Sequence, residues 1–187
     1  SFKENTVEQF QNALNQLLKQ GAKGLVFDVR EDGGGLVAAL EKIVDPLLPA
    51  GDIATATYQD GTTKVLVHSD ANELNLPMMV LVNGNTASAA ELFTASLKDF
   101  GKAEVIGEQT FGKGIMQNTF ELPDGGAVTL TVATYQTTKG ECYHGVGITP
   151  DVIMEEDYEK VDFDHPNPEQ DAQLKQVMEL LQSKISS

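Results

Sequence analysis

A serine and a lysine occupy two short segments of this chain, and each segment follows an apolar run typical of a buried strand. Ser88 lies in NTASAAE, residues 85–91, and Lys113 lies in TFGKGIMQ, residues 110–117. A serine hydroxyl is a weak nucleophile until a neighbouring base takes its proton, and a neutral lysine amine can be that base. The two segments therefore predict a Ser/Lys hydrolase site.

The surroundings of Lys113 in the sequence suit a base. To be neutral near pH 7, a lysine needs its pKa lowered by about 3 units from a reference near 10.4, and burial can supply a shift of that size. Phe111, Ile115 and Met116 are apolar, and no acid lies between residues 109 and 117. The glycines on both sides of the lysine let its backbone approach another loop closely.

Three further segments extend the pattern, namely DVREDGGGL at 28–36, LPDGG at 122–126 and GVGITPD at 145–151. In this order, and with the two segments above, residues 24 to 155 resemble the carboxyl-terminal processing peptidases, also called tail-specific proteases. The chain departs from the family pattern at Gly33, where proline or a small polar residue is usual. The family also has an upstream peptide-binding PDZ domain, which we expect in the full-length chain and do not find in this sequence.

The resemblance implies a role for each matching residue. Ser88 is the nucleophile, Lys113 is the general base, and Gln117 is a neutral partner that orients the lysine amine. Asp28 and Arg30 are groups that support the glycine turn after the first strand.

Acyl transfer also needs hydrogen-bond donors for an oxyanion, and the loss of one donor typically costs about 2.7–4 kcal/mol of barrier. Ser88 at a helix start offers the next backbone amide, that of Ala89, aided by the positive end of the helix. For a second amide the family match points to the glycine turn, where Gly34 is the first choice and Gly35 the next.

Histidine is the alternative base. His68 falls in a predicted strand, His144 in a loop, and His165 between an acid and a proline. Alanines flank Ser88, so the Gly-x-Ser-x-Gly context of a nucleophile elbow is missing. A Ser-His-Asp triad stays open as the less favoured reading.

Residues 107–114, GEQTFGKG, nearly match the phosphate-binding loop Gly-x-x-x-x-Gly-Lys-[Ser/Thr]. Gly114 replaces the hydroxyl residue that would hold magnesium, and residues 115–122 alternate like a strand instead of opening a helix. Nucleotide binding is therefore disfavoured. The sequence also has no His-Glu-x-x-His motif and no cysteine cluster, so it points to no metal or other cofactor.

The composition is ordinary for a soluble globular protein. A formal net charge of −15 would repel nucleic acids, anionic membrane surfaces and acidic substrates. Cys142 is the single cysteine, which excludes an internal disulfide and is read as an unpaired loop thiol. No apolar run approaches the roughly 18 residues that a bilayer crossing needs.

Hydrophobic periodicity predicts helices and strands in alternation, hence parallel strands with crossover helices. The expected helices cover residues 5–20, 36–44 and 86–100, and the expected strands 24–30, 78–82 and 103–106. Hairpins are expected at 53–68 and 115–135, each with an Asp-Gly step in its turn. A final helix is expected from Asn167, with Pro168 in its first turn.

By resemblance, the fold is the α/β core of the Clp protease and crotonase superfold, with a mostly parallel sheet, β-hairpins and a C-terminal helix. We expect one peptidase core domain over residues 1–187, with the helix at 167–187 appended. The implied reaction is hydrolysis of proteins near apolar C-termini through an acyl-enzyme on Ser88. The implied location is extracytoplasmic, whether periplasmic, secreted or membrane-anchored, and oligomerisation stays open.

The alternative from another class is a catalytically silent scaffold or peptide-binding module of the same fold. Residues 128–135 read as an exposed apolar edge strand, which an extended peptide could join in either case.

Overall fold

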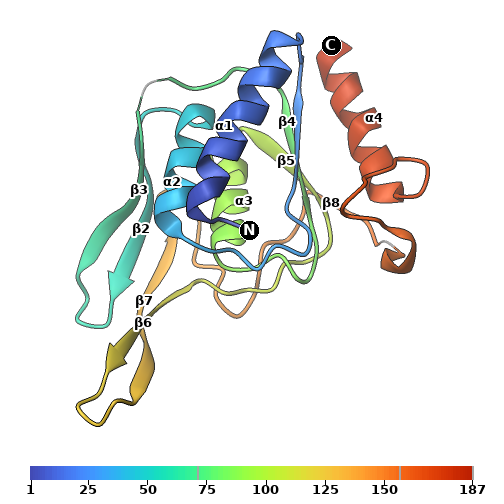
Figure 1. Cartoon of the computed structure of the whole chain (residues 1–187). Helices are drawn as coiled ribbons and strands as arrows, with labels where there is room; N and C mark the ends of the chain where they lie inside the picture. The colour runs from blue at the N-terminus through green and yellow to red at the C-terminus, as the bar shows by residue number, and fades with distance from the viewer. Residues whose placement is uncertain (71, 156, 187) are drawn as a thin grey trace.

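The computed structural model describes residues 1–70, 72–155 and 157–186, and it contains two four-stranded sheets (Figure 1). The first sheet is parallel, with the order β1-β4-β5-β8, and the second is antiparallel, with the order β3-β2-β7-β6. The parallel strands are β1 (Leu25–Asp28), β4 (Met78–Val82), β5 (Ala103–Gly107) and β8 (Val152–Ile153). The predicted α/β class is confirmed, whereas the two-residue strand β8 was not predicted.

In the described part of the chain, four helices accompany the sheets, namely α1 (Glu4–Lys19), α2 (Val37–Val44), α3 (Ala89–Asp99) and α4 (Ala172–Ser186). Two short 3-10 helices, η1 (Asp45–Leu47) and η2 (Tyr158–Lys160), lie in the connections. Residues of α2 and α3 join the main core on one face of the parallel sheet, whereas α4 packs on the other face (Figure 1).

Strand β4 is buried along its whole length and supplies both cores. Its alternate residues face opposite sides of the sheet, as strand geometry requires. Val80 belongs to the main core, while Met79 and Leu81 belong to a second cluster with Val177 and Leu181 of α4. Helix α4 is therefore packed against the sheet by apolar side chains.

The predicted start of α4, with Asn167 as its cap, is four residues too early. Residues 168–170 form a turn in which the Asn167 carbonyl accepts from the amide of Gln170. The helix begins at Ala172, and Asp171 caps it, because its Oδ1 accepts from the amide of Leu174 at 2.7 Å.

The antiparallel sheet comprises β2 (Gly51–Tyr58), β3 (Thr63–Ser69), β6 (Ile115–Glu121) and β7 (Ala127–Thr137). The prediction of an edge strand at 128–135 holds only in part, since β7 lies between β6 and β2 at residues 133–137, whereas residues 128–132 pair with β6 alone. Strand β6 is the edge along its whole length. The outer part of the β6–β7 hairpin extends beyond β2 (Figure 1).

Three neighbouring parallel strands position the site. Strands β1, β4 and β5 are in register, so their carboxyl ends meet at one edge of the sheet. The glycine turn follows β1, the Ser88 segment follows β4, and the Lys113 segment follows β5. The three predicted segments therefore lie in loops that follow parallel strands. Among the described residues, no helix combines the length and apolar character that a membrane crossing requires.

Candidate active site

Ser88 occupies a strained turn between the loop after β4 and the first residue of α3. Its backbone has φ 58° and ψ −120°, in a region that residues other than glycine rarely adopt. Such a conformation costs about 1–3 kcal/mol and persists where surrounding contacts enforce it. A nucleophile elbow is also a sharp strained turn from strand to helix. The alanines around Ser88 hid this likeness in the sequence.

The carboxylate of Glu91 holds this turn. Glu91 is fully buried in the first turn of α3, and its Oε2 accepts from the backbone amide of Ser88 at 2.9 Å. The same oxygen accepts from the amide of Lys113 at 2.8 Å. The other oxygen, Oε1, accepts from the Thr110 hydroxyl and the Gly112 amide, both at 2.6 Å. One carboxylate thus joins the serine turn to the lysine loop.

Glu91 places an acid beside the Lys113 loop, which the sequence did not indicate, and it supports the expectation that this loop does not bind a nucleotide. No acid lies near Lys113 in the sequence, yet the fold places this carboxylate on its backbone. The amides of Gly112 and Lys113, which a phosphate loop would offer to a nucleotide, are instead taken by Glu91. The segment after them is strand β6, as expected from its alternation, and not a helix.

The phenol of Tyr135 forms a second link between the two loops. Its hydroxyl donates to the backbone carbonyl of Lys113 at 2.7 Å and lies 3.5 Å from Ser88 Oγ. Burial raises the pKa of Tyr135 above its ordinary value, so the hydroxyl stays protonated and remains a donor.

The lysine side chain itself is not engaged with the serine. Lys113 is half-buried, and in the described part of the chain its amine forms neither a hydrogen bond nor an ion pair. Gln117 lies exposed on β6, beside a register shift between Met116 and Gln117, and no described hydrogen bond joins it to Lys113. The fold therefore brings the loops of Ser88 and Lys113 together but leaves the three side chains apart.

The glycine turn lies directly against Ser88. A Cβ on Gly34 would be 2.6 Å from the amide nitrogen of Ala89, and the φ of Gly34 is 93°, so the close approach requires glycine. The amide of Gly34 donates to Oδ1 of Asp32 at 2.8 Å. Among the described residues, the amides of Ala89 and Gly35 have no acceptor within hydrogen-bonding distance.

Asp28 and Arg30 lie where β1 leads into this turn. Oδ1 of Asp28 accepts from the backbone amide of Arg30 at 3.1 Å, and both carboxylate oxygens accept from its guanidinium. The pairing is local in sequence, and the same guanidinium reaches far beyond it, to the start of α4.

Of the three histidines, His144 is the one beside the lysine loop. Its Nδ1 lies 3.2 Å from the carbonyl oxygen of Gly112. Since a carbonyl only accepts, that nitrogen carries the hydrogen, and Nε2 of the neutral ring is left as the basic atom. His68 contacts Asp52 and His165 contacts Asp162, both on the exposed surface.

Glu91 and Tyr135 are the site residues that the sequence interpretation missed. Glu91 had a signal, because Ser88 and Glu91 form the Ser-x-x-Glu pattern of a capping box. Tyr135 had none, since its position on β7 reads only as an alternating strand residue.

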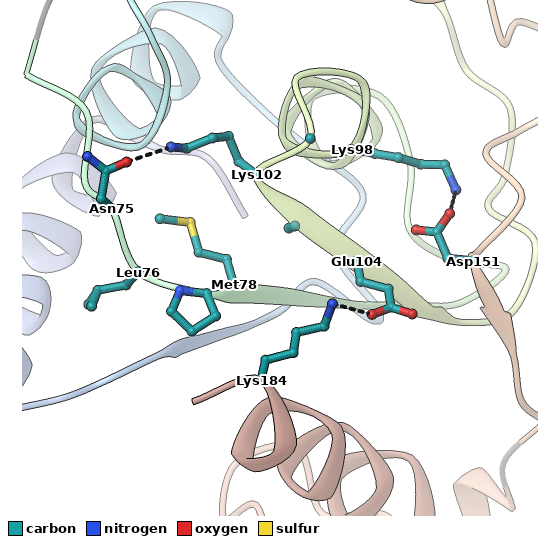
Figure 2. A pocket seen from close by; sticks show the side chains of 11 residues that line it. Asn75, Leu76, Met78, Lys98, Lys102, Glu104, Asp151 and Lys184 are labelled. Atoms are coloured by element: carbon teal, nitrogen blue, oxygen red, sulfur yellow. Dashed lines mark hydrogen bonds and ion pairs between the residues drawn. The ribbon is translucent and has the colours of Figure 1, made fainter. Parts of the chain in front are cut away.

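A separate hollow of about 670 Å³ lies at the opposite end of the parallel strands, where β4 and β5 begin (Figure 2). Each of its three lysines contacts an oxygen of a neighbouring side chain: Lys98 on Asp151, Lys102 on Asn75 and Lys184 on Glu104. Its lining contains no serine, threonine or cysteine. The predicted nucleophile, Ser88, lies at the other end of the strands.

A family model described as peptidase family S41 matches residues 1–154. The carboxyl-terminal-processing protease of Synechocystis sp. is 35% identical over 185 residues, which are 99% of this chain and 43% of that protein. The carboxy-terminal processing protease CtpA of Bacillus subtilis is 38% identical over 165 residues, 87% of this chain and 35% of that protein.

The solved structure of a photosystem II D1 C-terminal processing protease is 39% identical in sequence and superposes with a TM-score of 0.77. It covers 82% of this chain, and this chain covers 40% of it. The chain therefore spans less than half the length of each of these three relatives.

Proposed function

The chain belongs to peptidase family S41, and from this premise we propose that it is the catalytic core of a serine endopeptidase that cleaves proteins near their C-termini. The observation that supports this most directly is the pair of bonds from Ser88 and Lys113 to one oxygen of Glu91. A strained serine at a helix N-terminus, tied to a lysine loop, is an arrangement that serves acyl transfer.

In the proposed reaction, Ser88 Oγ attacks the carbonyl carbon of the scissile bond while the neutral amine of Lys113 takes the hydroxyl proton. The resulting ammonium gives its proton to the leaving amine as the tetrahedral species collapses, which leaves an acyl-enzyme on Ser88. Lys113 then takes a proton from water, which attacks the ester carbonyl. As the second tetrahedral species collapses, the ammonium returns that proton to Ser88 Oγ, which releases the shortened protein and restores the free enzyme. No cofactor takes part in these steps.

The oxyanion of the tetrahedral species is held in this proposal by backbone amides. Ala89 supplies one from the N-terminus of α3, whose positive end favours the developing charge. The glycine turn supplies the second, from Gly35 or from Gly34. Gly34 becomes available only when its amide leaves the Asp32 carboxylate.

The described arrangement is a resting one in this proposal. The Lys113 amine has still to reach the serine, and Gln117 has still to reach the lysine. Catalytic hydrogen bonds often tighten only when substrate binds. The same two missing contacts, between Lys113 and Ser88 and between Gln117 and Lys113, favour the second candidate, a silent scaffold or peptide-binding module of the same fold.

The proposed substrate, further domain and location rest on the family resemblance. We propose a protein substrate with an apolar C-terminus, a PDZ domain in the full-length chain that admits or gates it, and an extracytoplasmic location. A net charge of −15 disfavours acidic substrates in any of these settings.

A serine-directed fluorophosphonate probe tests the proposal, with the adduct mapped by mass spectrometry. The expected result is labelling at Ser88 that disappears in Ser88→Ala and falls by about 10²–10⁴-fold in Lys113→Met, the range that general base catalysis contributes. The fold tolerates Lys113→Met because both contacts of this residue with Glu91 and Tyr135 are made by its backbone. A folded wild-type protein that stays unlabelled would favour the scaffold.

A further inference from the structure

The guanidinium of Arg30 lies buried between two parts of the chain that are far apart in sequence. Its side chain is 1% exposed, and that of Asp171 is 3% exposed. Nη1 donates to Asp171 Oδ1 at 3.1 Å and Nη2 donates to Asp171 Oδ2 at 2.5 Å, a two-bond pairing of planar groups. Nη1 also donates to Oε1 of Gln173 at 3.1 Å.

Two carboxylates keep this cation charged inside the protein. Burial alone would lower the pKa of Arg30, but the hydrogen bonds and charges of Asp28 and Asp171 outweigh burial and raise that pKa above its ordinary value. Arg30 is therefore a permanent cation, and a buried cation needs its partners.

The partners of Arg30 belong to the N-terminus of α4. Asp171 caps that helix, and Gln173 is fully buried in its first turn. The side-chain Nε2 of Gln173 also donates to the backbone carbonyl of Met154 at 2.6 Å, which fixes the orientation of the side chain. The position of these two side chains is thus set by α4, whose apolar face packs on the parallel sheet.

The other end of the connection is the glycine turn. The residue after Arg30 is Glu31, a non-glycine residue with φ 58°. Its carboxylate accepts from the side-chain amides of Asn83, at 2.7 Å, and Asn85, at 3.0 Å, in the loop that leads to Ser88. Asp32 follows, and its carbonyl accepts from the amide of Ala87 at 2.9 Å. Gly34, which lies against Ser88, follows Arg30 by four residues, so a displacement of Arg30 would shift the glycine turn.

We infer that Asp171 and Gln173 are positioning residues for the proposed hydrolysis, because through Arg30 they hold the glycine turn in place against Ser88. The activity of the site then depends on α4 being docked, although no residue of α4 touches the reacting atoms. This inference rests on the proposed function for its catalytic part.

The test compares Asp171→Asn with Glu179→Gln, which removes the same charge from an exposed position of the same helix. Two quantities are measured at a temperature where circular dichroism shows every variant folded. They are the rate of fluorophosphonate labelling at Ser88 and the hydrogen exchange of the amides of residues 31–35. Gln173→Met, similar in size and uncharged, is a second variant in case Asp171→Asn does not fold.

We expect labelling of Asp171→Asn to fall between about tenfold and a hundredfold, as a displacement of roughly 1 Å in a catalytic group can cost. Exchange in residues 31–35 should quicken, and the pH profile of labelling should keep its shape, because the base is untouched. Gln173→Met should show a smaller loss of the same kind, and Glu179→Gln should match the wild type.

Wild-type labelling and exchange in a folded Asp171→Asn protein, or in Gln173→Met if the first does not fold, would overturn the inference. An unlabelled wild-type protein would instead defeat the proposed function and the catalytic part of the inference with it. In that case the exchange of residues 31–35 still decides whether the start of α4 holds the turn.

Discussion

The backbone amides of Ser88 and Lys113 donate to the same oxygen atom, Oε2 of Glu91, at 2.9 and 2.8 Å. The separation of the two loops is therefore set by one buried side chain. A carboxylate suits this place because it accepts at every lone pair, and four donors converge on it.

Replacement of Glu91 by glutamine should weaken both the fold and the site. The nitrogen of a glutamine amide cannot accept, so at least one of the four donors loses its acceptor. We expect the free energy of unfolding to fall by about 1–3 kcal/mol, the usual cost of an unpaired buried group. Labelling at Ser88 should slow about tenfold, equivalent to about 1.4 kcal/mol of barrier. Urea denaturation and labelling rates measure the two effects.

Glu8→Gln is the control for that variant, since Glu8 is exposed on α1 and its neutralisation should change stability by less than about 0.5 kcal/mol. A Glu91→Gln protein as stable and as reactive as this control would show that the shared oxygen does not position the loops.

Gly34 and its neighbour Gly33 should respond oppositely to alanine. A Cβ at Gly34 would lie 2.6 Å from the Ala89 nitrogen, with φ at 93°, whereas a Cβ at Gly33 would meet nothing within 4 Å. Gly34→Ala should cost at least about 1–3 kcal/mol of stability and slow labelling by about a hundredfold as the turn moves from Ser88. Gly33→Ala should change neither. Equal reactivity of the two variants would contradict a role for the turn in the site.

Tyr135→Phe tests the second link between the loops. It removes the hydrogen bond to the Lys113 carbonyl, so stability should fall by about 1 kcal/mol, and labelling should slow about tenfold. Tyr143 is the control, because it packs edge-on against Tyr135 and its buried hydroxyl has no hydrogen-bond partner among the described residues. Tyr143→Phe should be neutral. A loss in Tyr143→Phe as large as that in Tyr135→Phe would trace the effect to packing of the rings.

The pH dependence of labelling separates lysine from histidine. A lysine base is active when neutral, so the rate should rise with pH as the amine loses its proton. Tyr135 does not end this rise within the neutral range, because its raised pKa keeps the phenol protonated there. A rise governed by a group that titrates near 6.5 would instead indicate histidine.

His144→Ala makes the choice between the two bases explicit. We expect it to label within about twofold of the wild type, a change of less than 0.5 kcal/mol in barrier. If it abolished labelling in a folded protein while Lys113→Met did not, the base would be His144.

The sequence was informative where a single segment carries the signal. The apolar run at 78–82 became β4, and the Asp-Gly hairpin at 53–68 became β2 and β3, because burial and turn chemistry act locally there. The meeting of the three loops could also be predicted, because each loop follows a parallel strand and the carboxyl ends of parallel strands lie at one edge of the sheet.

The remainder depends on contacts between distant segments. Arg30 and Asp171 are 141 residues apart, and the sequence around neither residue indicates that the two side chains pair. Tyr135 enters the site because β7 crosses beside the lysine loop, which its own alternation does not reveal. Helix α4 starts late because an aspartate cap at 171 prevailed over the Asn-Pro signal at 167.

The exposure of strand β6 lowers the local stability of the segment that carries Gln117. From Gln117 onward every one of its residues is exposed, so no buried side chain secures this part of the β6–β7 hairpin. Segments of that kind open with a small fraction of the global unfolding energy. Gln117, the residue proposed to orient Lys113, therefore lies in a segment that opens easily. A substrate or neighbouring domain that binds the hairpin would fix the position of Gln117 without disturbing the core.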